Sequence, residues 1–317
     1  MSVTLLRVRA TGVVLALVAL ALTACSTDFG QVRLAIAAGS AGGVYNSLSQ
    51  ALATAWVRDV GVGAVDVQET AGAVDNLDRL RDGRAQVGFA QADVAATTLD
   101  AAEGTGHRVY ALARMHDDYT QVVVRADLSA RTVAELRGLR VSVGAKTSGT
   151  KVIAERVLAS AGVDPVTDIA AQLLDINASV AAMEAGALDA FFWSGGIPTR
   201  QITDLSAKVQ LRILDLSDVL PKLRAKFPVY GSATLPASTY QLSTGPIITL
   251  VVRNFLLVND EVSDDVAQAL TGGLFQAQAD LLTASKVARS IEVRSAIETT
   301  PVPLHPGAIR YYRDAKV

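Results

Sequence analysis

The sequence contains very little cysteine and few aromatic residues, and it has no cluster of basic residues. Cys25 is the single cysteine among 317 residues, so no intramolecular disulfide can form and the fold must be stabilised by its core. Aromatic residues make up 5% of the chain, and 29 Lys and Arg residues stand against 31 Asp and Glu residues. Proteins that bind nucleic acids need basic patches and stacking platforms, so we expect no nucleic-acid partner.

The usual signatures of catalysis and of metal binding are also missing. His107, His116 and His305 lie far apart, with no H-E-x-x-H pattern and no cysteine partners, so we expect no metal site. Ser194 lies in W-S-G-G rather than in the G-x-S-x-G of a nucleophile elbow. Pairs of carboxylates can occur in any α/β cleft, which leaves a hydrolase as the least favoured alternative. The sequence therefore predicts a protein that is not an enzyme.

The N-terminus has the pattern of a secretory signal. Arg7 and Arg9 precede an apolar run over residues 13–22, which is too short to span a bilayer but suits a signal peptide. The run ends in LTAC, which resembles a bacterial lipobox with Cys25 as the acylated residue; the alternative is a chance cysteine after an ordinary signal. We expect residues 1–24 to be cleaved, residues 25–31 to form a tether, and the remaining body to be extracytoplasmic and lipid-anchored to the membrane.

Short apolar runs alternate with amphipathic segments along the rest of the chain, which predicts an α/β fold with mostly parallel sheets. Helices are expected over residues 44–57, 74–81 and 94–101. Strands are expected over residues 32–38, 65–68, 86–90, 108–113, 120–125, 140–144, 170–175, 188–193, 209–214 and 248–253. The order indicates a first lobe over residues 32–118 and a second over 119–240. Residues 241–317 would return to the first lobe, giving two connections and a hinge.

The segment GAKTSGTK, residues 144–151, resembles a phosphate-binding loop. Gly144 and Gly149 have the required spacing, but Thr150 and Lys151 come in reverse order, and a lysine one place late points roughly 100° away on a helix. Nucleotide hydrolysis is therefore disfavoured. A strand that runs into such a turn and then a helix still offers free N–H groups to a small anion.

Within this turn, Ser148, Gly149 and Thr150 are the predicted anion-binding residues, and the alternative is a plain helix cap. Lys146 could supply a positive charge or could be a surface lysine. Arg114 and Arg253, near strand ends, are weaker candidates for that charge.

A second glycine-rich turn, GSAGG, follows the first strand. Gly39 and Gly43 would allow unusual dihedral angles and a close approach to a ligand, Ser40 can donate or accept a hydrogen bond, and Tyr45 supplies a flat wall that carries a hydroxyl. An ordinary strand-to-helix turn is the alternative.

Two further stretches follow buried strands at the edge where open α/β sheets bind ligands. Gln91 is a predicted ligand contact, whereas Asp93 is expected to cap a helix and Asn76 to be solvated or locally bonded.

In FFWSGGIP, Trp193 is expected either to line the cleft or to lie in the core. Gly195 would form the turn, and Pro198 would occupy the first turn of a helix.

Five segments occur in the order that is typical of one family: GSAGGVYNSLSQALA, TAGAVDNLDRLRDGRAQVGFAQADVA, VSVGAKTSGT, GALDAFFWSGGIPTRQI and PLHPGAIRYYRD. With them the chain resembles a TAXI-type solute receptor of the tripartite ATP-independent periplasmic (TRAP) transporters. The resemblance implies a two-lobed type II periplasmic-binding-protein fold, a ligand in the cleft between the lobes, and no cofactor. It also implies a small carboxylate ligand, such as glutamate, glutamine or 2-oxoglutarate, and delivery to TRAP membrane permease subunits.

Some further expectations and one alternative complete this interpretation. We expect a monomer. The matching motifs contain no arginine fork of the kind that clamps a carboxylate in the other large class of TRAP receptor. His305 is expected to pack against or cap the last helix. An extracytoplasmic sensor that signals to a histidine kinase is the alternative function.

Overall fold

The computed structural model describes residues 28–101, 106–240 and 245–317. The predicted signal peptide and the predicted acylation site, Cys25, lie outside these residues. Within the described part of the chain, no helix is both long enough and apolar enough to cross a membrane. The same residues contain no group of His, Cys, Asp and Glu side chains that could hold a metal ion.

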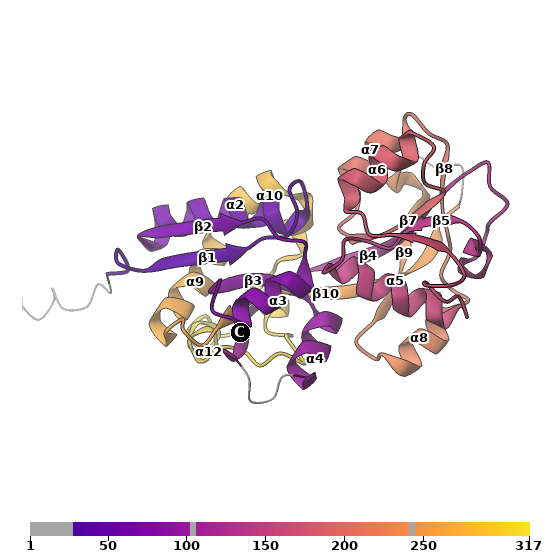
Figure 1. Cartoon of the computed structure of the whole chain (residues 1–317). Helices are drawn as coiled ribbons and strands as arrows, with labels where there is room; N and C mark the ends of the chain where they lie inside the picture. Colours follow the sequence, from indigo (N-terminus) through magenta and orange to yellow (C-terminus); the bar gives the residue numbers. More distant parts are fainter. Residues whose placement is uncertain (1–27, 102–105, 241–244) are drawn as a thin grey trace, which may run out of the picture.

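The described chain forms two lobes joined by one continuous ten-stranded sheet (Figure 1), which confirms the predicted α/β, two-lobed architecture. The expectation of mostly parallel sheets was wrong, because β4 and β10 run antiparallel to the strands beside them. The strands are β1 (Arg33–Ala37), β2 (Ala64–Gln68), β3 (Val87–Gln91), β4 (Val109–Arg125), β5 (Arg140–Ser142), β6 (Ala170–Gln172), β7 (Ala190–Gly195), β8 (Leu211–Ile213), β9 (Gly231–Leu235) and β10 (Ile247–Asn259). Their order is β2-β1-β3-β10-β4-β7-β5-β6, with β8 beside β4 and β9 beside β10.

Helices cover both faces of this sheet. They are α2 (Val44–Ala55), the π-helical η1 (Trp56–Val60), α3 (Ala73–Arg81), α4 (Ala92–Ala101), α5 (Gly149–Ser160), α6 (Ile176–Glu184), α7 (Arg200–Ser206), α8 (Leu220–Lys226), α9 (Asp264–Gln276), α10 (Gln278–Ala284), α11 (Val293–Ala296) and α12 (Pro306–Asp314). Short 3-10 turns are η2 (Val133–Leu136), η3 (Ala237–Thr239) and η4 (Lys286–Ser290).

The first lobe illustrates how the sequence pattern produces these elements. Every residue of β3 is buried because β3 pairs with β1 on one side and β10 on the other. In α3 the buried residues Ala73, Leu77 and Leu80 recur at helical spacing and pack against the sheet. Helices α2 and α9 share a separate cluster with β1 on the opposite face, so the parallel strands β2, β1 and β3 are covered on both sides.

Strands β4 and β10 run through both lobes and pair with each other along most of their length. The residues 254–258 of β10 pair with β3 of the first lobe, whereas residues 247–251 pair with β9 of the second. In the same way, β4 pairs with β7 and β8 of the second lobe over residues 119–125. The chain thus crosses between the lobes inside two long antiparallel strands, and the domain boundaries at residues 118 and 240 stay predictions.

Two strand assignments from the sequence were wrong. The segments 108–113 and 120–125 are one 17-residue strand, β4, because the polar residues between them remain in the sheet. His116 and Asp118 there are almost completely buried, so they fill an internal site and do not end the strand. Strand β9 was not anticipated, since Gly231, Ser232 and Thr234 give it neither an apolar run nor bulky β-branched pairs.

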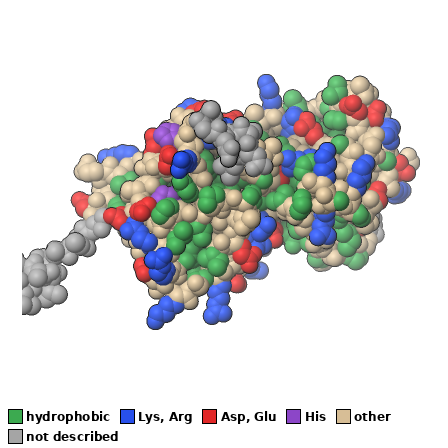
Figure 2. Space-filling view, turned by 90° about the horizontal axis from the view of Figure 1, so that it is seen from below, with side chains coloured by type: hydrophobic (Ala, Val, Ile, Leu, Met, Phe, Trp, Pro, Cys, Tyr) green, Lys and Arg blue, Asp and Glu red, His purple; other side chains and the backbone are tan. Residues whose placement is uncertain are grey.

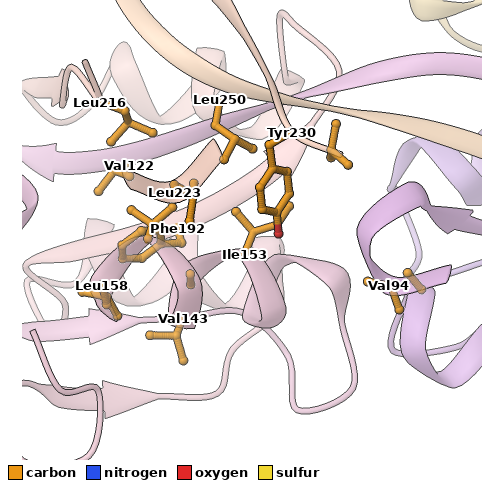
Figure 3. Close-up of a cluster of buried hydrophobic side chains, with 14 of the residues drawn as sticks. Val94, Val122, Val143, Ile153, Leu158, Phe192, Leu216, Leu223, Tyr230 and Leu250 are labelled. Carbon is orange, nitrogen blue, oxygen red and sulfur yellow. The ribbon is translucent and has the colours of Figure 1, made fainter. Parts of the chain in front are cut away.

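A hydrophobic cluster continues from the second lobe to the first. It includes Val143, Ile153, Phe192 and Tyr230 of the second lobe and Val94 of α4 in the first (Figure 3). Because apolar side chains pack across the boundary here, the two lobes share an interface and are not connected by the crossing strands alone.

The C-terminal helices pack on the first lobe, where α12 contacts α9 and α10 contacts α2. His305 is the N-cap of α12: its Nδ1 accepts a hydrogen bond from the Gly307 N–H over 3.1 Å, and its Nε2 lies 3.0 Å from the Val262 carbonyl oxygen. The predicted capping role is confirmed. On the face drawn in Figure 2, basic and acidic side chains are interspersed over both lobes.

Candidate functional site

A cavity of about 70 Å³, counted as the space open to the centre of a water-sized sphere, lies between the two lobes. Its lining residues come from the first lobe, from the second lobe and from the crossing strand β4: Ala38, Gly39, Ser40, Gly43, Val44, Tyr45, Ala71, Gly72, Ala73, Gln91, Asp118, Ser148, Gly149, Thr150, Trp193, Ser194 and Gly195. Polar contacts also join the lobes. The Asp75 N–H donates to the Thr147 carbonyl over 3.3 Å, and the Asn177 side chain donates to the Ala41 carbonyl over 3.2 Å. The lobes therefore touch each other around the cavity.

Three helix N-termini point into this cavity. Residues 43–45 at the start of α2, 72–73 at the start of α3 and 149–150 at the start of α5 all line it. Among the described residues, no acceptor is hydrogen-bonded to the N–H groups of Val44, Ala73, Gly149 or Thr150. Free N–H groups and the positive ends of three helix dipoles make this a favourable site for an anionic group.

The α5 end shows how the two interpretations of GAKTSGTK combine. Ser148 is the N-cap of α5: its Oγ accepts from the Lys151 N–H over 3.2 Å and donates to the Ala145 carbonyl over 2.8 Å. Thr150 is buried, and its Oγ1 accepts from the Ser194 N–H over 3.4 Å. The Ser148 hydroxyl thus organises the turn, which leaves backbone N–H groups as the free donors.

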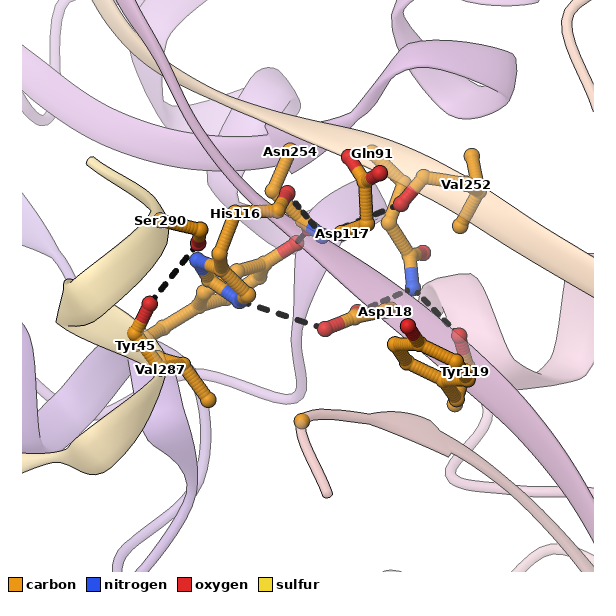
Figure 4. Close-up of polar contacts among 12 residues, drawn as sticks. Tyr45, Gln91, His116, Asp117, Asp118, Tyr119, Val252, Asn254, Val287 and Ser290 are labelled. Atoms are coloured by element: carbon orange, nitrogen blue, oxygen red, sulfur yellow. Dashed lines mark hydrogen bonds and ion pairs between the residues drawn. The ribbon is translucent and has the colours of Figure 1, made fainter. Parts of the chain in front are cut away.

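The floor of the cavity is a polar group centred on Asp118 of β4. The Gln91 amide donates from Nε2 to Asp118 Oδ2 over 2.9 Å and to Ser194 Oγ over 3.0 Å, so it bridges the first lobe, the crossing strand and the second lobe. Gln91 and Asp118 are each only 3% exposed. His116 lies on the same face of β4, with its Nε2 atom 3.2 Å from Asp118 Oδ1 (Figure 4).

Tyr45 forms one wall of the cavity. Its ring stacks on Phe89 at a centroid distance of 5.2 Å and meets the His116 ring edge-on at 6.3 Å. Its hydroxyl donates to Asn254 Oδ1. Burial, and then the nearby negative charges of Asp118 and Asp93, raise the pKa of Tyr45 well above its usual value, so the phenol stays neutral.

Ten of the twelve residues predicted to contact a ligand line the cavity. They are Gly39, Ser40, Gly43, Tyr45, Gln91, Ser148, Gly149, Thr150, Trp193 and Gly195, and their contact with a ligand stays a prediction. The other two do not line it: Lys146 is exposed, and Pro198 is exposed two residues before α7 begins. Pro198 is therefore not in the first turn of a helix, since Thr199 is the N-cap of α7.

Several details of the turns differ from expectation. The positive φ angles in GSAGG belong to Gly39 (73°) and Gly42 (75°), whereas Gly43 has an ordinary φ of −76° as the N-cap of α2. The Trp193 indole N–H donates to Thr199 Oγ1 over 3.0 Å. Trp193 is thus held at the edge of the cavity by a hydrogen bond within its own turn.

Two polar residues of the first lobe are more structural than the sequence suggested. Asp93 does not cap α4: its buried carboxylate accepts from Tyr230 and Arg156 of the second lobe. Asn76 is fully buried and not solvated; its Nδ2 donates to the Phe89 carbonyl over 2.8 Å, and its Oδ1 accepts from the Thr70 hydroxyl. The local bonding expected for Asn76 is confirmed.

Sequence reasoning missed Asp118, Ser194 and the Ala71–Ala73 turn. Asp118 had an available signal, because charged residues in the middle of an alternating apolar pattern indicate either the end of a strand or a buried polar site. Residues 71–73 had none, since a short Ala-Gly turn becomes part of a site only when the lobes come together. Arg114, a weaker candidate for the positive charge at the ligand, forms ion pairs with Asp117 and Glu298.

A model of the NMT1-like family matches residues 36–315 of the chain. Among solved structures, the alkanesulfonate-binding protein SsuA from Xanthomonas axonopodis pv. citri, bound to MOPS, is similar with a TM-score of 0.52 and 19% identity, over 89% of this chain and 83% of that one. PhnD1 from Prochlorococcus marinus, in complex with methylphosphonate, is similar with a TM-score of 0.51 and 12% identity, over 90% and 95%. A protein from Bordetella bronchiseptica RB50 has a TM-score of 0.54 and 18% identity, over 90% and 89%.

Proposed function

We propose that this protein, which belongs to the NMT1-like family, is an extracytoplasmic solute-binding protein that captures a small carboxylate between its lobes. The observation that carries the proposal is the convergence of three helix N-termini on one cavity at the lobe boundary. Each helix end stabilises an anion by about 0.3–1 kcal/mol when exposed and by up to about 2 kcal/mol when partly buried. Three of them can hold a carboxylate without an arginine.

The ligand we propose is of the size and charge of glutamate, glutamine or 2-oxoglutarate. Its carboxylate accepts from the free N–H groups of Gly149 and Thr150 and from those at the start of α2 and α3. Tyr45 and Trp193 form apolar walls around its carbon chain. MOPS and methylphosphonate, which are bound in two similar structures, are also acids, so both belong in the set of probes.

We further propose that Cys25 anchors the protein to the membrane by a lipid and that the loaded protein delivers its ligand to TRAP-type permease subunits. The support is the collinear set of motifs that resembles the TAXI receptors. The second candidate, a sensor that signals to a histidine kinase, shares the same cavity and ligand. Permease genes beside this gene would favour transport, and a kinase gene would favour sensing.

A melting screen of the purified body, residues 26–317, with amino acids, dicarboxylates, sulfonates, phosphonates, sugars and nucleotides tests the binding function. A ligand at about a hundred times its dissociation constant stabilises the folded state by about 2.7 kcal/mol, which raises the melting temperature by several degrees. We expect small carboxylates to do so, and titration calorimetry then gives the affinity. A shift with sugars or nucleotides alone would refute the carboxylate proposal.

A further inference from the structure

Two buried oxygen atoms beside the cavity have no hydrogen-bond donor within the described residues. One is Oδ1 of Asp118 and the other is Oε1 of Gln91. Both residues line the cavity and are nine-tenths or more buried. A buried acceptor without a donor costs about 1–3 kcal/mol, and more when it is charged, so two in one place indicate a donor that the protein itself does not supply.

Neighbouring side chains do not provide that donor. The Gln91 Nε2 group already donates to the other oxygen of Asp118 and to Ser194. His116 Nε2 lies 3.2 Å from Asp118 Oδ1, yet its direction does not make a hydrogen bond, and both atoms remain without one. Within the described part of the chain, no Lys or Arg lines the cavity. Asp118 Oδ1 therefore lies at the cavity wall, beside His116 (Figure 4), without a hydrogen-bond donor from the described residues.

The cavity wall thus carries groups of opposite polarity close together, since Gln91 Oε1 lies against Gly149 at the start of α5. Three helix N-termini offer positive potential and free N–H groups, whereas Asp118 and Gln91 offer acceptors and a negative charge. We propose that Asp118, together with Gln91, forms an ammonium-binding subsite and that the ligand is an α-amino acid, a refinement that rests on the proposed function. The α-carboxylate then lies at the helix ends and the α-ammonium donates to Asp118 Oδ1 and Gln91 Oε1.

This arrangement selects against ligands that lack the amine. An α-oxo acid presents a carbonyl oxygen where the ammonium would be. That oxygen, Asp118 Oδ1 and Gln91 Oε1 are then three neighbouring acceptors without a donor. A phosphonate adds negative charge near the same carboxylate. A site built to bond a group of the ligand discriminates strongly against an analogue without that group. Asp118 is accordingly the specificity-determining residue.

Matched pairs of acids test the subsite on the unaltered protein body. The pairs are glutamate with 2-oxoglutarate, alanine with pyruvate, leucine with 4-methyl-2-oxopentanoate, and phenylalanine with phenylpyruvate, measured by calorimetry. In the pair that binds most tightly we expect the amino acid to bind about tenfold or more tightly than its oxo acid. A smaller preference, or the reverse, overturns the subsite while the carboxylate-binding function stands. If no acid binds, the proposed function and the subsite fail together.

Asp118→Asn tests the residue directly, because asparagine has the same shape and keeps an acceptor for Gln91. We expect amino-acid affinity to fall about 10- to 100-fold while oxo-acid affinity is unchanged or rises, so that the preference within each pair disappears. Asp117→Asn is the matched control. Asp117 immediately precedes Asp118 in β4, does not line the cavity, and accepts from Arg114 Nη2 at its Oδ1 over 3.1 Å. An Asp118→Asn protein that keeps both its melting temperature and its amine preference refutes the proposal.

Discussion

Arg156 of α5 in the second lobe donates from Nη1 to Oδ2 of Asp93 of α4 in the first lobe over 3.0 Å. The Asp93 side chain is completely buried, and that of Arg156 is 15% exposed. The Tyr230 hydroxyl donates to the same oxygen over 2.6 Å, and the Arg156 guanidinium lies 4.3 Å from the centre of the Phe227 ring. This buried network joins the lobes next to the cluster that continues across their boundary.

Arg156→Met should lower the free energy of unfolding by about 3–5 kcal/mol, because it leaves the carboxylate of Asp93 buried without its counter-charge. Urea unfolding at pH 7 measures the change. Arg200→Met is the control, since Arg200 pairs with Asp204 on the surface, where such pairs contribute about 0–1 kcal/mol. An Arg156→Met protein as stable as this control would mean that the network does not stabilise the fold.

The same network predicts a pH effect. Burial raises the pKa of Asp93 above its usual value, while the hydrogen bond from Tyr230 and the charge of Arg156 oppose the rise. Without Arg156 the pKa of Asp93 rises further, so the folded state binds the proton more tightly than the unfolded state. Stability then increases as the pH falls through the raised folded pKa toward the unfolded pKa. The free energy of unfolding of Arg156→Met should therefore rise between pH 7 and pH 5, relative to that of Asp93→Asn/Arg156→Met, which lacks the carboxyl group. Parallel curves for the two proteins would contradict this.

Gly149→Ala should weaken ligand binding about tenfold or more and should also lower the melting temperature of the free protein, because buried hydrogen bonds are lost. A Cβ atom at Gly149 would lie 1.5 Å from Gln91 Oε1 of the opposite lobe, so the Gln91 side chain must move and give up its hydrogen bonds to Asp118 and Ser194. Calorimetry with the best ligand of the screen measures the loss. In Gln91→Ala/Gly149→Ala the clash is absent, so this double variant should bind the ligand almost as tightly as Gln91→Ala alone. Strictly additive losses would show that the clash is not the cause.

His305 should make the stability of the protein fall in mild acid. Burial lowers the pKa of His305 below its usual value of about 6.5. Below about pH 6.5 the unfolded state binds a proton at His305 and the folded state does not. The stability that neutral His305 contributes is therefore present above about pH 6.5 and is lost as the pH falls through the lowered folded pKa. His305→Asn keeps an N-cap acceptor without the titration, so its melting temperature should decline less between pH 7.5 and 5.5.

His305→Ala separates capping from titration. At pH 8 it should be about 0.5–2 kcal/mol less stable than the parent, whereas His305→Asn should be close to the parent. If asparagine is as damaging as alanine at pH 8, the bond from His305 Nε2 to the Val262 carbonyl is the larger contribution of this side chain.

Cys25→Ser, in the full chain expressed in its own host or a bacterial relative, should release the protein from the membrane fraction. The melting temperature of the folded body should not change, since a tether outside the core contributes no packing. Fractionation followed by immunoblotting distinguishes the two outcomes. Retention of the serine variant in the membrane fraction would refute the lipobox interpretation.

Local sequence patterns were enough to predict many of the helices and strands and the general location of the site. Periodicity located α3 and the buried strands β1 and β3, and the glycine-rich turns located the ends of α2 and α5. These features are local: the hydrophobic spacing and the turn chemistry are each contained within about ten residues.

Only the tertiary structure decided which polar groups meet in the cavity. Asp118 is defined as a site residue by Gln91, 27 positions earlier in the chain, and by Ser194, which hydrogen-bonds to Gln91 from 103 positions later. Lys146 lies in the same turn as Ser148 and Thr150, and yet it is exposed and does not line the cavity. Burial and the lack of a donor depend on contacts between distant segments. For that reason the sequence indicated an anion site, and the assembled lobes added the acidic group that faces it.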